Sequence, residues 1–278
     1  MWISHSLVIC LFMSQLSFDY HTHCELCKYA EGRPFDYIKA ARAGGIEQIA
    51  ATDHCPTPHQ YDPEHRMEID QFAKYREWIE DARMSNPDRV LFGVEADFYS
   101  GCISFLDEFF HEHPLDIVIG SVHFQSYWAH QESERGLFDK EDLKWVYKRY
   151  YKLVGLMVES GQYDVVSHFD LPKKRGGKLP HEEQHDMVRP ILDKVKKAGM
   201  AIEINTSGLI HEAKEIYPSP EILSLAHERE IPITFGSDAH TPDRVGANFK
   251  EAVALAKEIG YTHYNTYKQR TATPVPLA

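Results

Sequence analysis

The chain has 278 residues, of which 43% are hydrophobic and 26% are charged, proportions typical of a globular protein large enough for one α/β barrel domain. Its 30 Lys and Arg residues stand against 42 Asp and Glu residues, so the formal net charge is -12. This balance argues against a nucleic acid or an anionic membrane as the main partner.

Residues 1–16 read as an N-terminal extension. The apolar run at 7–13 is too short to span a bilayer, and no Lys or Arg precedes it as in a secretory signal. Met13 is therefore a candidate for the true start, with a weak export signal as the alternative. The cysteines are odd in number and contain one CxxC, Cys24 and Cys27, which favours a reducing cytoplasm over a disulfide framework.

Seven runs of apolar and β-branched residues predict strands, at 16–20, 46–52, 90–96, 116–122, 164–167, 201–206 and 232–236. Segments with helical periodicity lie between them, including 34–44, 69–83, 141–160, 182–199 and 219–229. Strands that alternate with helices predict a parallel sheet, here long enough to close into a barrel. We therefore expect one α/β domain over 17–270, with a polar loop at 127–140.

Side chains that can bind metal close six of the seven predicted strands. They are Asp19, His21, His23, Asp53, His54, Glu95, Asp97, His123, His168, Asp170, Asp238 and His240. Because the carboxyl ends of parallel strands meet on one face of a barrel, these residues would share a pocket. Capping of strand ends could account for one or two of them, but the repetition predicts a metal site.

Imidazole and carboxylate together suit zinc, iron(II) or manganese in hydrolytic sites. His21 and His23 form an HxH pair, whose rings face the same side of an extended chain. Glu95 is the candidate to bridge two cations, which would acidify a shared water molecule and stabilise charge on an attacked phosphorus. Asp238 and His240 are candidates for the proton donor to the leaving group, with a metal-bound water as the alternative. The sequence contains neither a G-x-S-x-G elbow nor a P-loop.

Several segments carry a resemblance to a known family: HTH at 21–23, ATDH at 51–54, GVEAD at 93–97, GSVHF at 120–124, SHFDLPKK at 167–174, EINTSG at 203–208 and GSDAH at 236–240. In this order they resemble the PHP (polymerase and histidinol phosphatase) superfamily, and more closely its histidinol-phosphate phosphatase branch. The resemblance runs from about Asp19 to Gly260. It implies a distorted seven-stranded (β/α)7 TIM-like barrel with a trinuclear site at the C-terminal strand ends.

The resemblance also implies which side chains hold each cation. The first would be held by His21, His23, Glu95 and Asp238, the second by Glu95, His123 and His168, and the third with the help of His54 and His240. The branch usually places a further histidine ligand in a segment like LCxHAEG, where this chain has Tyr29. A tyrosine is a poor ligand unless ionised, and Lys28 beside it would repel a cation, although Glu25 or a cysteine could substitute. We therefore expect two or three divalent cations, of zinc, manganese or iron.

The branch resemblance implies hydrolysis of L-histidinol phosphate to histidinol and phosphate, a step of histidine biosynthesis. Arg66, Lys173, Lys174 and Arg175 are candidates to bind the phosphate, although Lys and Arg runs are often solvated faces. Asp97 and Tyr99 are candidates to bind the imidazole and amine.

Two other functions remain open from the sequence. One is a PHP phosphoesterase for a nucleotide or sugar phosphate, and the other is a non-catalytic metal-binding module. In the leading hypothesis the partner is a small phosphorylated substrate, and the protein is a cytoplasmic monomer or small homo-oligomer.

Overall fold

A computed structural model describes residues 16–58, 61–123 and 142–277 of the chain. The predicted extension 1–16 lies outside this part except for Leu16, and the predicted loop 127–140 lies outside it entirely. In the described part, no helix is long and apolar enough to cross a membrane.

Seven strands form one sheet, ordered as they occur along the chain, and each neighbouring pair runs parallel. They are β1 (Phe18–Thr22), β2 (Gln48–Ala51), β3 (Val90–Asp97), β4 (Ile117–Ser121), β5 (Val165–Val166), β6 (Ala201–Asn205) and β7 (Ile233–Gly236). Every strand predicted from the sequence is present, so the expected parallel α/β barrel is confirmed. The first strand begins and ends two residues later than predicted, which places His21 within it.

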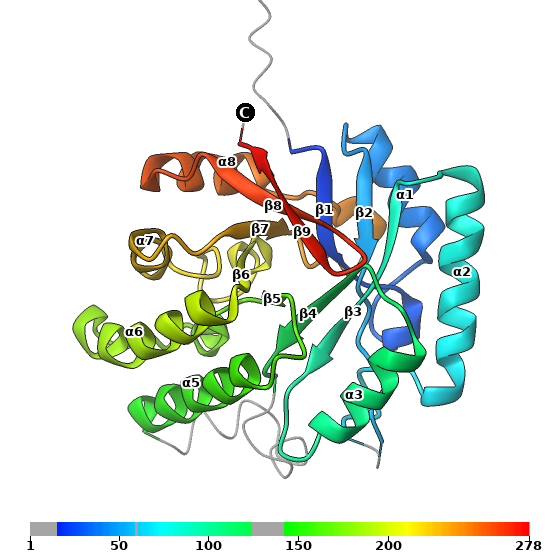
Figure 1. The fold of residues 1–278 in the computed structure, drawn as a ribbon. Coiled ribbons are helices and arrows are strands. Elements are labelled where there is room, and N and C mark those ends of the chain that lie inside the picture. Colours follow the sequence, from blue (N-terminus) through cyan, green and yellow to red (C-terminus); the bar gives the residue numbers. More distant parts are fainter. Residues whose placement is uncertain (1–15, 59–60, 124–141, 278) are drawn as a thin grey trace, which may run out of the picture.

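The sheet curls until its first and last strands meet at one end. Ala239, just after β7, forms a parallel bridge with Thr22 of β1. The amide of His23 donates to the carbonyl of Ala239 at 2.9 Å, and the amide of Ala239 donates to the carbonyl of His21 at 3.2 Å. These bonds nearly close the barrel, as Figure 1 shows, and bring the end of β1 beside the segment after β7.

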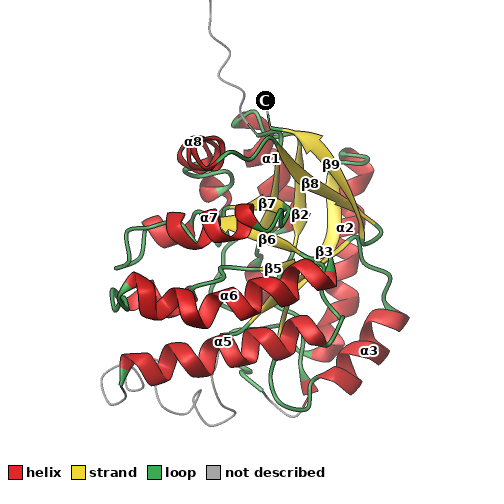
Figure 2. Cartoon of the chain, turned by 60° about the vertical axis from the view of Figure 1, so that its left-hand side comes forward, coloured by secondary structure: helices red, strands yellow, loops and turns green. Residues whose placement is uncertain are grey.

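Helices cover the outside of the barrel: α1 (Pro34–Ala43), α2 (Phe72–Ser85), α3 (Ile103–Glu112), α5 (Leu143–Glu159), α6 (His181–Ala198), α7 (Pro220–Glu228) and α8 (Phe249–Ile259). Figure 2 shows α5, α6 and α7 side by side along the strands. The five predicted helices are present, and the predicted helix 69–83 begins with a separate 3-10 turn at Ile69–Gln71.

Local sequence explains where these helices begin and end. The Ser219 hydroxyl caps α7 by accepting from the amide of Ile222 at 3.4 Å, and Pro220 stands in the first turn, where no N–H partner is needed. Helix α6 ends at Gly199, whose φ of 69° lies in the left-handed region that glycine tolerates. Both boundaries agree with the sequence pattern.

A C-terminal hairpin that the sequence did not predict packs against the first and last strands. Its strands are β8 (His263–Lys268) and β9 (Thr271–Pro276), which pair antiparallel. The Tyr264 ring lies 4.7 Å from that of Phe18 on β1 and 5.8 Å from that of Phe235 on β7, centroid to centroid. The amide of Leu277 donates to the carbonyl of Thr262, so packed structure continues beyond the predicted boundary at 270.

Candidate metal centre

All the predicted ligands meet at the closed end of the barrel. They are His21, His23, His54, Glu95, His123, His168, Asp238 and His240. The strands bring them together because each residue lies at or just beyond the carboxyl end of its strand. Three of the side chains reach the surface in part, with exposures of 19% for His123, 14% for Asp238 and 28% for His240. The cluster is therefore buried on one side and open on the other.

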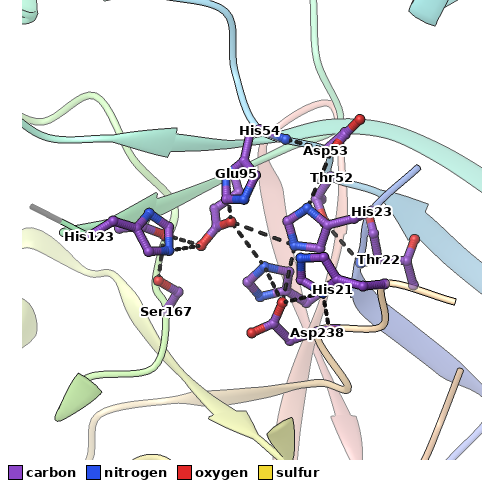
Figure 3. Close-up of polar contacts among 12 residues, drawn as sticks. His21, Thr22, His23, Thr52, Asp53, His54, Glu95, His123, Ser167 and Asp238 are labelled. Carbon is purple, nitrogen blue, oxygen red and sulfur yellow. Dashed lines mark hydrogen bonds and ion pairs between the residues drawn. The ribbon is translucent and has the colours of Figure 1, made fainter. Parts of the chain in front are cut away.

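Glu95 lies at the middle of the cluster (Figure 3). Its Oε2 atom is 3.4 Å from Nε2 of His21 and 3.1 Å from Nδ1 of His54. Its Oε1 atom is 3.0 Å from Nε2 of His168 and 3.6 Å from Nε2 of His123. One carboxylate thus presents an oxygen to each of two imidazole groups, which is the arrangement required of a bridging ligand.

Asp238 lies beside His21 and His23, the two histidines at the end of the first strand. Its Oδ1 atom lies 3.1 Å from Nε2 of His23 and 3.7 Å from Nε2 of His21. The Ser207 hydroxyl donates to Oδ2 at 3.1 Å and so fixes the carboxylate plane. Asp238 has a φ of 56°, a left-handed conformation that a short polar residue accepts and that is common at functional sites.

Three sets of side chains within the cluster bring their ligand atoms within 4.8 Å of one another. They are His21 with His23 and Glu95, His54 with Glu95 and His123, and His23 with His54 and His240. A fourth set lies behind His23 and joins it to Cys27 and Asp53. Beside that set the Cys24 thiol donates to Asp53 at 2.9 Å, and Cys24 and Cys27 are both buried and free.

Electrostatics keep the bridging carboxylate ionised and some of the imidazoles neutral. Burial opposes the charge on Glu95, but the imidazoles of His21, His123 and His54 hold the pKa of this carboxyl well below its usual range. Burial lowers the pKa of His54 well below its usual range. Burial and the neighbouring His23 lower the pKa of His240 to about 4. Neutral imidazoles keep a lone pair that a cation can accept.

A second layer of carboxylates orients three of the imidazole rings. Glu203 lies 2.6 Å from Nδ1 of His21, Asp53 lies 3.3 Å from Nδ1 of His23, and Asp97 lies 2.5 Å from Nδ1 of His123. Each contact leaves Nε2 of the ring facing the cluster. Asp53 was among the side chains that the sequence placed at strand ends, but Glu203 was not singled out. The signal was present, because Glu203 is two residues from Asn205 on β6 and so faces the same side.

Gly236 makes room for the contact between Glu203 and His21. A Cβ atom at this position would lie 2.1 Å from Oε1 of Glu203 and 2.5 Å from Cβ of His21. Neither neighbour can move without leaving the cluster. Glycine is therefore required at the end of β7 so that the carboxylate and the imidazole can approach each other.

Arg66, Asp97 and Tyr99 were predicted to bind substrate, and the structure gives them other surroundings. Arg66 is buried, and its Nη2 atom donates to Asp97 at 2.5 Å. The two oxygens of Asp97 are thereby shared between Arg66 and His123, which supports an orienting role rather than a substrate contact. The Tyr99 ring stacks on Tyr61 at 4.0 Å, and its buried hydroxyl makes no hydrogen bond to a described residue.

The other predicted phosphate ligands, Lys173, Lys174 and Arg175, differ in how deeply their side chains are buried. Lys173 is buried and donates to Asp170, Glu215 and the carbonyl of Ile216, which uses all three of its hydrogens. Its predicted phosphate contact is therefore not supported. Lys174 is half-buried and Arg175 is exposed.

Lys174 and Arg175 act electrostatically on His211, a residue that the sequence did not single out. Burial lowers the pKa of His211, and the charges of Lys174 and Arg175 lower it further. The same imidazole is within electrostatic reach of Asp238 and His168. The charges of Lys174 and Arg175 therefore act on an imidazole that the charges of the cluster also influence.

Tyr29 replaces the expected further histidine, and its hydroxyl lies 2.5 Å from Nε2 of His54. The ring stacks on His240 at 4.7 Å. Glu25, considered as a substitute ligand, is instead paired with Arg33 at 3.3 Å on the surface. Of Glu25 and Tyr29, it is thus Tyr29 that contacts the cluster, while Cys27 lies behind it in the set with His23 and Asp53.

Known proteins are similar to this chain in sequence and in fold. The family described as PHP domain matches residues 19–207, and the family described as PHP-associated matches residues 221–249. A probable histidinol-phosphatase from Deinococcus radiodurans is 37% identical over 247 residues, which cover 87% of this chain and 93% of the relative. The chain belongs to the PHP family. The predicted resemblance is therefore confirmed.

Further PHP relatives agree in sequence and in fold. The histidinol-phosphatase of Bacillus subtilis is 28% identical over 258 residues, covering 82% of this chain and 95% of the relative. A crystal structure of histidinol phosphate phosphatase from Lactococcus lactis, complexed with zinc, L-histidinol and phosphate, matches with a TM-score of 0.79. At 21% identity it covers 94% of this chain and all of that chain, which shows that the PHP barrel is shared.

Proposed function

We propose that this PHP chain is a metal-dependent phosphomonoester hydrolase that converts L-histidinol phosphate into L-histidinol and phosphate. The geometry that supports hydrolysis is the position of Glu95, whose two oxygens face separate imidazole groups. The substrate is supported by the 37% identity to a probable histidinol-phosphatase over nearly the whole of both chains.

The donor set fits divalent cations such as zinc, manganese or iron(II). Buried nitrogens of His21, His54 and His240 (Nε2, Nδ1 and Nε2) make no hydrogen bond in the described structure, although each faces the cluster. We infer that His21, His23, Glu95 and Asp238 hold one cation, and that Glu95, His123 and His168 hold a second. When bound, such cations supply Lewis-acid stabilisation of phosphoryl charge and acidify water to near neutrality.

The chain's own carboxylates orient the metal-binding imidazoles, and its backbone determines which nitrogen of His240 carries the hydrogen. Glu95 fixes the separation of the two imidazole groups, and Asp53, Asp97 and Glu203 hold the rings in the orientation that directs Nε2 inward. Nδ1 of His240 lies 2.9 Å from the carbonyl of Asp238, which selects the tautomer with hydrogen on Nδ1. Neutral His240 therefore has a lone pair on Nε2, so it would accept a proton or a cation rather than protonate the leaving group.

Lys174, Arg175 and His211 are the candidates to bind the phosphate at the open side of the cluster. Cationic side chains there would draw a phosphate dianion toward the acidic chain, and an arginine can bind it with two hydrogens. The predicted roles of Lys174 and Arg175 thus stay proposals, and His211 joins them.

Phosphate release from a panel of monoesters tests the function. L-histidinol phosphate, nucleotides and sugar phosphates would be offered to the protein as purified, after chelation, and after return of zinc, manganese or iron(II). We expect selective turnover of L-histidinol phosphate that chelation abolishes and one of the metals restores. Turnover of another ester alone would keep the chemistry and reject the substrate. No turnover with any metal would reject the enzyme and favour a binding module.

A further inference from the structure

Tyr29 is held in place by contacts on both sides of its segment. The amide of Glu31 donates to the carbonyl of His240 at 2.8 Å. On the other side, the Lys28 ammonium binds Glu68 at 2.7 Å and also the carbonyl of Pro63. These contacts fix the backbone beside the cluster, so the position of the Tyr29 ring is set before any ligand arrives.

The Tyr29 hydroxyl enters the cluster while one face of its ring stays in water. The ring is 48% exposed and stacks on the imidazole of His240. The hydroxyl lies 2.5 Å from Nε2 of His54, which is a full hydrogen bond. Tyr29 therefore covers the set of possible ligands formed by His23, His54 and His240.

The contact with Tyr29 determines which nitrogen of His54 can bind a cation. Nδ1 of His54 is buried, lies 3.1 Å from Oε2 of Glu95 and makes no hydrogen bond. The contact with Oε2 of Glu95 is close but does not have hydrogen-bond geometry, so a hydrogen on Nδ1 would have no aligned acceptor. We therefore assign the hydrogen to Nε2, which donates it to the Tyr29 oxygen at 2.5 Å. The lone pair of Nδ1 then faces the set formed with Glu95 and His123. His54 thus belongs to the second cation.

A third cation would find too few ligands beside Tyr29. Nε2 of His23 faces Asp238 at 3.1 Å and Nδ1 faces Asp53 at 3.3 Å, so both nitrogens are engaged. Nε2 of His54 is bonded to Tyr29. With Nδ1 of His54 assigned to the second cation, Nε2 of His240 is the one nitrogen without a partner that is left among the described members of this set. Zinc sites in proteins use three or four protein ligands, which this position does not offer.

We propose that this chain works with two cations, and that the Tyr29 hydroxyl takes the position of a third as a neutral hydrogen-bond donor to a phosphoryl oxygen. The Tyr29 oxygen accepts from His54, which leaves its own hydrogen free to point into the pocket. The inference about the phosphoryl contact rests on the proposed function, whereas the number of cations does not.

The first test counts cations in the intact chain. Wild type and Tyr29→His would be loaded with excess zinc, desalted and analysed by elemental mass spectrometry. We expect two zinc ions per wild-type chain and three in Tyr29→His, because an imidazole at this position adds a ligand and releases His54. Phe35→His, which adds a histidine at an exposed position of α1, is the matched control and should hold two. Three ions in the wild type, or two in a folded Tyr29→His chain, would overturn the inference.

The second test measures the affinity of the zinc-loaded protein for inorganic phosphate by calorimetry. Removal of the hydroxyl in Tyr29→Phe should raise the dissociation constant roughly tenfold or more, the usual loss for a hydrogen bond to a charged group. An unchanged constant in a folded variant would reject the phosphoryl contact. Neither test needs turnover, so a failure to hydrolyse L-histidinol phosphate would count against the proposed function alone.

Discussion

At the scale of single residues, Glu95 is the side chain that both proposed cations would share, because its two oxygens face different imidazoles, those of His54 and His168. In Glu95→Gln an amide nitrogen replaces one of the two anionic oxygens, and an amide nitrogen does not bind a cation. We expect cation affinity to fall by more than about 100-fold and phosphate release to fall at least as far. Zinc titration and the phosphate assay would measure this, with Glu112→Gln on the surface of α3 as control. Unchanged zinc binding in Glu95→Gln would contradict the bridging role.

A substitution at Gly236 tests the carboxylates that orient the imidazole rings without replacing any proposed metal ligand. In Gly236→Ala the new Cβ would collide with Glu203 and His21, as the distance of 2.1 Å to Oε1 shows. We expect cation affinity to fall about 10- to 100-fold, as when an orienting partner is removed. Gly44→Ala, where the nearest atom lies 3.4 Å away, is the matched control. Equal zinc affinity in both variants would mean that the Glu203 contact is not needed.

The sequence predicted single residues well where they close a strand. Every proposed ligand belongs to that pattern, because a parallel barrel turns a linear repetition into a spatial cluster. The sequence did not show that Arg66 and Lys173 have protein partners, for a different reason. Whether a cationic side chain is free or paired depends on carboxylates distant in sequence, such as Asp97, 31 residues from Arg66. That pairing is set by the folded chain and leaves no local pattern.

At the scale of elements, the segment after β7 carries Asp238 and His240, and Asp19 on β1 anchors it. The Asp19 carboxylate accepts from the amide of Ser237 at 3.0 Å and from that of Gly246 at 2.8 Å. In Asp19→Ala both amides lose a buried acceptor, so the segment should become mobile. We expect cation affinity to fall about 10-fold or more. Faster hydrogen exchange of residues 237–246 would show the mobility. The control Asp186→Ala, at an exposed position of α6, should change neither the exchange rate nor the cation affinity.

The hairpin β8–β9 contributes stability rather than chemistry. Tyr264 packs on Phe18 and Phe235, so Tyr264→Ala should lower the free energy of unfolding by about 3 kcal/mol. Thermal unfolding would measure the loss, and turnover at low temperature should be retained. His263→Ala, at an exposed position of the same strand, should leave the midpoint within a degree or so. A stable Tyr264→Ala chain would mean that the hairpin is only loosely attached.

Sequence pattern located the elements of the barrel but not all of their limits. The first strand was expected to end at Tyr20, where its apolar run stops before His21 and Thr22. They continue the strand because the inside of the barrel at this end is itself polar. The hairpin was not predicted because its polar residues alternate without a long apolar run, and its packing against β1 and β7 joins distant parts of the chain.

At the scale of the whole molecule, the fold buries imidazole nitrogens of His21, His54 and His240 that make no hydrogen bond in the described structure and could bind cations. Because cations would bind the native state and not the unfolded chain, they should stabilise it by about 3 kcal/mol at 100 times the dissociation constant. For a chain of this size we expect chelation to lower the unfolding midpoint by roughly 5 to 10 °C. Differential scanning calorimetry with and without zinc would measure the shift. Glu95→Gln should show a much smaller shift, and a wild-type midpoint that ignores chelation would contradict a buried centre.

The meeting of β1 with the segment after β7 also fixes the order of events during synthesis. His23 and Asp238 are in contact although 215 residues separate them. At ordinary translation rates the histidines of the first strand leave the ribosome about 10 to 40 s before that aspartate. Until then the HxH pair has neither its carboxylate partner nor a closed barrel around it. A cation captured earlier by the nascent chain would therefore be held by an incomplete set of the proposed ligands.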